Sequence, residues 1–234
     1  MKKIKKEKNV SKKKSKNNFI KKIIICLIVL LLAVGIGFFG YNKFFKEEPV
    51  EDKPLENSTV EELYDVVKTT KCTYIEDTSD KKMTQDSLLY VIFSKLHKDG
   101  KLKKEIAYND YIAAAKSVIG SDQVIPTKFS NYDYDGYSYT LNKKIITRTV
   151  GTCGDKEYVS KLFGYSHNED ETELQVYIKV AYIKDGKLYD LNDKELGDYS
   201  EEEENSLLDL STSKIYTYEK QGAEYKLKGI TNGE

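Results

Sequence analysis

The chain has 234 residues with 38 basic and 38 acidic side chains, so its formal net charge is zero. Residues 1–22 alone hold eleven lysines and one glutamate, which leaves 27 basic and 37 acidic residues in the remainder. A basic head on an acidic body excludes an ordinary cytosolic globular protein. The acidic body contains one arginine, Arg148, and therefore argues against nucleic acid as a partner.

An uncharged apolar run of nineteen residues extends from Ile23 to Tyr41. As a helix rising about 1.5 Å per residue, it has roughly the length of the hydrocarbon core of a bilayer. Lysines beside a membrane span resist translocation. We therefore expect residues 1–22 to be a cytoplasmic tail near anionic lipid headgroups, residues 23–41 to be a transmembrane helix, and the rest to lie outside the cell membrane.

A cleavable signal peptide is the alternative, because Ala33-Val34-Gly35 places small residues at the spacing of a cleavage site. The apolar run continues through Phe38 and Phe39, which favours a retained helix. The segment Gly35 to Gly40 also matches GxGxxG. Since that fingerprint binds dinucleotides only between a strand and a helix, we expect no cofactor here.

Residues 42–58 are charged and contain two of the three prolines, which is typical of a linker. Residues 59–234 are long enough to form one domain with a full core. Capping residues, apolar periodicity and glycine stops predict five helices. These are one capped by Ser58, one from Leu88 to Leu96 after Thr84, one from Asn109 to Ile119, one from Lys156 to Phe163, and one from Ser200 to Leu210.

The second half of the domain is predicted to form three β-hairpins. Asp135-Gly136 and Asp185-Gly186 are strong two-residue turn signals, and a third turn is expected around Gln221-Gly222. In this third hairpin a two-residue loop would place Glu219 opposite Glu224, so a longer loop is favoured. Helices followed by an antiparallel meander predict an α+β fold.

The first hairpin pairs Tyr134 with Tyr137 and Tyr132 with Tyr139, so the four tyrosines share one face. An exposed face of this kind would be an aromatic platform for a sugar ring or a peptide. The other face of the hairpin is polar, however, and aromatic cross-strand pairs ordinarily supply packing. Burial of the tyrosines is therefore the favoured interpretation.

The second hairpin gathers apolar residues on one face: Leu174, Val176, Ile178, Val180, Tyr182, Tyr189 and Leu191.

Cys72 and Cys153 are the two cysteines beyond the predicted membrane helix, and we expect them to form a disulfide. The alternatives are a reactive thiol at Cys153 and two unpaired thiols.

The start of a calcium loop is imitated by Asn131, Asp133 and Asp135, but Asn142 stands where the bidentate glutamate is needed. We therefore expect no metal site.

No nucleophile motif is convincing. Ser79-x-x-Lys82 and Ser211-x-x-Lys214 match SxxK spacing, yet no partner motif accompanies them. No catalytic residue is predicted.

Several segments together resemble a known kind of protein: the lysine-rich head, the apolar span, the acidic stalk, Lys161-Leu162-Phe163-Gly164 and the ending Tyr216 to Leu227. They are similar to membrane-anchored proteins of unknown function from low-GC Gram-positive bacteria. The order of elements in the outer domain is similar to the cone-shaped sheets of NTF2-like or cystatin-like folds, which host both enzymes and binding modules.

The resulting expectation is a single-pass membrane protein whose extracytoplasmic α+β domain binds an extracytoplasmic protein or a cell-wall ligand. The alternative is a cell-envelope hydrolase with a site assembled from dispersed residues.

Overall fold

The computed structural model describes residues 57–76 and 83–233, which belong to one compact unit. The predicted tail, membrane helix and most of the linker lie outside the described residues. Among the residues that are described, no helix is long and apolar enough to cross a membrane. The description below therefore concerns the predicted outer domain, which is α+β with antiparallel sheets.

Three of the predicted helices are present close to their predicted bounds, and a fourth is present in shortened form. The first three are α2 (Asn57–Val67), α3 (Gln85–Lys98) and α4 (Tyr108–Val118). The Thr84 side chain caps α3 by accepting a hydrogen bond from the Ser87 backbone N–H, and basic residues occupy the last turn, where they complement the helix dipole. α2 already begins at Asn57, so Ser58 lies inside the helix rather than at its cap.

The predicted helix from Lys156 to Phe163 was wrong, because this segment belongs to strand β5 (Glu157–His167). Its backbone pairs with β6 (Glu173–Lys184), and this tertiary partner overrides the weak helical pattern. Gly164 follows an irregularity in the pairing after Leu162 and does not end a helix. The last helix, α5 (Glu204–Leu208), is shorter than predicted, and Ser200 caps a preceding turn.

Two antiparallel sheets form the rest of the domain. The small sheet has the order β1 (Glu105–Ala107), β4 (Ile145–Val150), β3 (Tyr137–Asn142) and β2 (Tyr132–Tyr134). The large sheet has the order β10 (Glu224–Asn232), β9 (Ser213–Gln221), β6, β7 (Lys187–Asp190) and β8 (Glu195–Asp198), with β5 also paired to β6. One edge of β6 pairs with β5, while the other pairs first with β9 and then with β7.

The register of the first two hairpins is as predicted. Tyr134 faces Tyr137, and Tyr182 faces Tyr189. In each turn both central residues, Asp-Gly, have positive φ, as a type I′ turn requires. The third turn is not longer than two residues but is moved by one position to Gly222-Ala223. This shift places Lys226 opposite Glu219 and avoids the unfavourable pairing of two glutamates.

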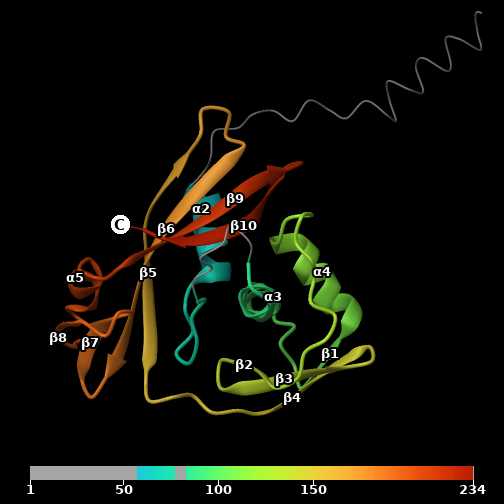
Figure 1. Ribbon diagram of the computed structural model, residues 1–234, viewed down its shortest axis with the longest axis horizontal. Coiled ribbons are helices and arrows are strands. Elements are labelled where there is room, and N and C mark those ends of the chain that lie inside the picture. The colour runs from blue at the N-terminus through green and yellow to red at the C-terminus, as the bar shows by residue number, and fades with distance from the viewer. Residues whose placement is uncertain (1–56, 77–82, 234) are drawn as a thin grey trace, which may run out of the picture. The chain divides into compact units, whose positions relative to one another are not determined.

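The core is centred on α3, nine of whose fourteen residues are buried. Figure 1 shows α3 end-on, with the small sheet below it, α4 beside it, and strands β9 and β10 of the large sheet above it. α3 lies against α2, α4 and β2. The apolar face predicted for the second hairpin contributes Leu174, Val176, Ile178, Val180 and Tyr182 as buried residues.

Candidate functional site

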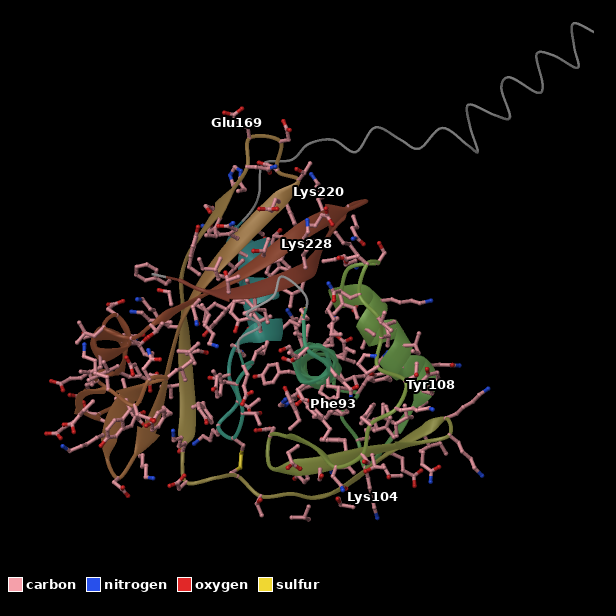
Figure 2. All side chains as sticks on the ribbon, viewed as in Figure 1. Phe93, Lys104, Tyr108, Glu169, Lys220 and Lys228 are labelled. Carbon is pink, nitrogen blue, oxygen red and sulfur yellow. A yellow bond between two sulfur atoms is a disulfide. The ribbon has the colours of Figure 1, made fainter. Side chains whose placement is uncertain are left out.

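The predicted tyrosine platform on the first hairpin is for the most part core. Tyr134 is 1% exposed and Tyr139 is fully buried, while Tyr132 is half-buried. Their rings surround Phe93 of α3, with centroid distances of 5.9, 4.5 and 5.4 Å. Figure 2 labels Phe93 at the centre of this region. We call these four side chains the hairpin cluster; burial raises the pKa of Tyr132 and Tyr134 well beyond the ordinary value.

Tyr137 is the exception on this hairpin. It is 37% exposed, and the Arg148 guanidinium lies 4.1 Å from the centre of its ring. Its cross-strand partner Tyr134 contacts Phe93 of α3, whereas the ring of Tyr137 contacts Arg148 of β4. A single exposed ring with a cation upon it is not a platform.

A second set of tyrosines, which we call the tyrosine row, crosses the large sheet. It consists of Tyr74, Tyr158, Tyr182 and Tyr189. The ring centroids lie 4.7 Å apart from Tyr74 to Tyr158, 6.2 Å from Tyr158 to Tyr182, and 5.4 Å from Tyr182 to Tyr189. Tyr182 is buried, whereas the other three rings are half-buried and so retain contact with solvent.

Strand pairing fixes three rings of the row. Tyr182 on β6 stands directly opposite Tyr158 on β5 and Tyr189 on β7, so all three project from the same face of the sheet. The Tyr182 and Tyr189 rings are stacked, with 14° between their planes.

The fourth ring, Tyr74, comes from the segment between α2 and α3. This segment lies along β5, because the Tyr158 N–H donates to the Lys71 carbonyl at 3.0 Å. The buried Lys214 ammonium donates to the Ile75 carbonyl at 3.1 Å and holds the far end of the segment. Tyr74 is therefore positioned by contacts with two strands that follow it much later in the sequence.

Two ion pairs border the tyrosine row. Asp193 accepts hydrogen bonds from the Tyr182 hydroxyl at 2.6 Å and from Lys156 Nζ at 3.0 Å, and both lower its carboxyl pKa. The Lys156 ammonium also lies 3.8 Å from the centre of the Tyr182 ring. Nearby, Lys184 bonds to Asp155 and lowers the pKa of that carboxyl. Each pair thus presents one ammonium and one carboxylate beside the rings.

Cys72 and Cys153 form a disulfide, with their Cα atoms 4.8 Å apart. Figure 2 shows it as the yellow bond between the segment that precedes α3 and the connection from β4 to β5. The first segment continues to Tyr74, and the second continues to Lys156 and Tyr158. The disulfide therefore links the segment that carries Tyr74 to the segment that leads to Tyr158, at one end of the tyrosine row.

The disulfide also touches the first hairpin. A Cβ at Gly136 would lie 3.3 Å from Cys153 Sγ and 3.7 Å from Cys72 Sγ. Since Gly136 also has a positive φ, both the turn and the neighbouring sulfurs favour glycine there.

A cavity of about 310 Å³ between α2, α3 and the first hairpin contains His97 and Ser94. Its charged residues are largely paired with one another, because Asp65 binds both Lys68 and Lys98. The Ser94 side chain is buried and bonds to Tyr134, so its hydroxyl is not presented as a nucleophile. A groove of about 530 Å³ lies beside Tyr132, between the N-terminal end of α3 and the Thr73–Glu76 segment.

The SxxK matches and the residues that imitate a calcium loop do not form a site in the described part of the chain. The Ser211 hydroxyl is buried and donates to the Leu208 carbonyl at 2.8 Å, whereas Ser79 and Lys82 lie outside the described residues. Asp133 and Asp135 lie in the first hairpin and its turn. No group of three or more His, Cys, Asp or Glu side chains suited to a metal occurs within residues 57–76 and 83–233.

Sequence reasoning found only part of the tyrosine row. It paired Tyr182 with Tyr189 but could not tell that Tyr189 would remain half-exposed. It missed Tyr158 because β5 was predicted to be a helix. The segment gives no strand signal, since its apolar residues come in the neighbouring pairs Tyr158-Val159 and Leu162-Phe163 and do not alternate with polar ones. Tyr74 gave no signal, since its place depends on a disulfide and on strand contacts distant in sequence.

Comparisons with known protein families, with curated proteins and with solved structures each found no match to this chain. The candidate site therefore rests on its own geometry: a row of tyrosines with solvent access, two bordering ion pairs and a disulfide that holds one end.

Proposed function

We propose that this chain is a single-pass membrane-anchored protein whose extracytoplasmic domain binds a ligand through the tyrosine row. The observation that carries the proposal is the partial exposure of Tyr74, Tyr158 and Tyr189 in a continuous aromatic row, since buried rings would serve packing alone. Aromatic rings with bordering charged groups are the usual composition of a recognition surface.

Two features support the proposed location. The lysine-rich residues 1–22 precede an uncharged run that is long enough to span a bilayer, which favours a cytoplasmic tail beside anionic headgroups. The Cys72–Cys153 disulfide favours an oxidising compartment for the domain. We also propose that the outer domain is similar to NTF2-like or cystatin-like folds, in which helices cover a curved antiparallel sheet.

Binding is favoured over hydrolysis because the two carboxyl groups that border the row, Asp155 and Asp193, are held in ion pairs with lysines. A hydrolase of the acid–base type needs a carboxyl whose pKa is raised toward neutrality. The described carboxyls with a shifted pKa are Asp65, Asp155 and Asp193, and all three are lowered. For Asp155 and Asp193 the main cause is a hydrogen bond from a neighbouring side chain, which keeps the carboxylate charged.

The location is tested by adding a protease to intact cells that carry the full chain. We expect loss of the region after Tyr41 and survival of the lysine-rich tail, because the outer domain is then the part that the protease reaches. Detection of both ends with separate antibodies reports the result. Survival of the outer domain in intact cells, with cleavage after lysis, would contradict the proposed topology.

Binding is tested by sedimentation of the full chain, in detergent, with insoluble cell-envelope material. We expect the unaltered protein to sediment with this material and Tyr189→Ala to remain largely in the supernatant. Tyr137→Ala is the matched control, since it removes an exposed tyrosine outside the row. Equal loss in both variants, or no sedimentation of the unaltered protein, would contradict the proposal. Release of soluble fragments from the material would favour the hydrolase.

A further inference from the structure

The chemistry around the tyrosine row restricts the class of ligand. An extended peptide usually binds a sheet through unpaired backbone groups at a strand edge. The backbone beside the row is already used: β5 bonds to β6 and to the Lys71 carbonyl, and β7 lies between β6 and β8. A ligand at the row therefore meets side chains only, which disfavours a peptide held by strand addition.

The balance of charges beside the tyrosine row disfavours a second class of ligand, the polyanions. Two ion pairs beside the row, Lys156–Asp193 and Lys184–Asp155, are neutralised. Two further charges near its rings also have opposite signs: the buried Lys214 ammonium lies 5.2 Å from the centre of the Tyr74 ring, and the Glu76 carboxylate acts on Tyr158. The single arginine of the chain, Arg148, lies on Tyr137 of the small sheet instead. A polyanion such as a phosphate-rich polymer needs an excess of cations, and the balanced pairs do not provide it.

An uncharged sugar chain fits both restrictions. A pyranose ring has an apolar C–H face that packs on an aromatic ring and hydroxyl groups at its rim that both donate and accept hydrogen bonds. The row offers Tyr158 and Tyr189, with Tyr74 at the edge of the core, as half-buried rings that retain contact with solvent, while the ion pairs supply a carboxylate as acceptor and an ammonium as donor.

We propose that the tyrosine row binds an uncharged carbohydrate chain, with sugar rings against the tyrosines and sugar hydroxyls at the Lys156–Asp193 pair. This inference rests on the proposed function, since it names the ligand class for the same surface. Tyr189 is the most informative residue, because its ring is stacked on Tyr182 and is itself half-exposed.

The test is equilibrium binding of the full chain, in detergent, to four soluble probes. Two are uncharged hexasaccharides, of β-1,4-linked N-acetylglucosamine and of β-1,4-linked glucose; the others are inorganic polyphosphate and a proline-rich peptide. We expect binding of at least one hexasaccharide at millimolar concentration or below, with Tyr189→Ala weakening it about tenfold. Tyr189→Phe should keep the affinity, because it keeps the ring, and Tyr137→Ala should be without effect.

Salt gives an independent readout. Affinity for an uncharged ligand should change little between low and high ionic strength, whereas affinity for a polyanion should fall steeply. Circular dichroism of each variant establishes that the fold is retained. Any of three results overturns the inference: neither hexasaccharide binds, Tyr189→Ala and Tyr137→Ala behave alike, or a comparison probe binds the row instead.

The two proposals fail separately. If the chain sediments with envelope material in a Tyr189-dependent manner but neither hexasaccharide binds, the binding function stands and the carbohydrate class is wrong. If it does not sediment and neither hexasaccharide binds, both proposals are wrong.

Discussion

The hairpin cluster and the tyrosine row begin from the same local pattern and end in different environments. Each contains an Asp-Gly turn with a tyrosine pair beside it, Tyr134 with Tyr137 and Tyr182 with Tyr189. In the first hairpin α3 places Phe93 against the rings and buries most of them. In the second, the main neighbours of β7 are the strands β6 and β8, and Tyr189 stays half-exposed.

This difference shows that aromatic residues on one face of a strand pair do not by themselves indicate a binding site or a buried core. What decides is whether another element covers the face. The following predictions separate the buried tyrosines from the accessible ones, and they run from the largest expected effect to the smallest.

Alkaline pH should destabilise the domain through its buried tyrosines. Burial raises the pKa of Tyr90, Tyr111, Tyr132 and Tyr134, so they keep their protons in the folded state. In the unfolded chain they ionise near pH 10, so stability falls as the pH rises above about 10, by about 1.4 kcal/mol per unit for each such tyrosine. Denaturant unfolding at pH 8 to 11, followed with tyrosinate absorbance, measures this. Ionisation of all 19 tyrosines before unfolding would contradict it.

Replacement of Tyr134 by alanine should cost about 3 to 5 kcal/mol of unfolding free energy, because it removes a large ring from the core. Tyr137→Ala is the control, as it truncates the cross-strand partner at an exposed site and should cost about 1 kcal/mol or less. Chemical denaturation of the two variants gives both values. A loss below about 1 kcal/mol for Tyr134→Ala would show that the hairpin cluster is not part of the core.

Loss of the disulfide in the double variant Cys72→Ser and Cys153→Ser should cost about 2 to 4 kcal/mol, since the bond closes a long loop in the unfolded chain. It should also weaken binding at the tyrosine row, because it frees the segment that carries Tyr74. Mass spectrometry of the alkylated full chain checks the bond. One of the three cysteines should react without reductant and all three after reduction; three reactive thiols at the outset would rule the bond out.

The smallest effects should come from single hydroxyl groups in the core. The Tyr111 hydroxyl donates to the Pro126 carbonyl at 2.8 Å, so Tyr111→Phe should cost about 1 kcal/mol. The buried Tyr139 hydroxyl has no hydrogen-bond partner among the described residues, although the nearby Arg148 guanidinium opposes the rise that burial causes in its pKa. Tyr139→Phe should therefore be neutral or slightly stabilising. A larger loss for Tyr139→Phe than for Tyr111→Phe would reverse this assignment.

Local sequence signals predicted much of the fold. Thr84 identified the start of α3, and the two Asp-Gly turns fixed the register of their hairpins, because caps and tight turns depend on a few neighbouring residues. The pairing of β6 with β9 across the sheet had no such signal, and β5 was mistaken for a helix. Its conformation depends on β6, whose strand pairing outweighs local propensity.

The amino-acid sequence alone determined the α+β class and the register of two hairpins, since these follow from turn chemistry and periodicity. It favoured the pairing of Cys72 with Cys153, which the structure then showed. Tertiary structure decided which tyrosines are buried and which remain accessible. Local pattern sets the face from which a side chain projects, but burial depends on what packs over that face. For Tyr134 this is α3, whereas for Tyr189 the stacked ring of Tyr182 leaves it half-exposed.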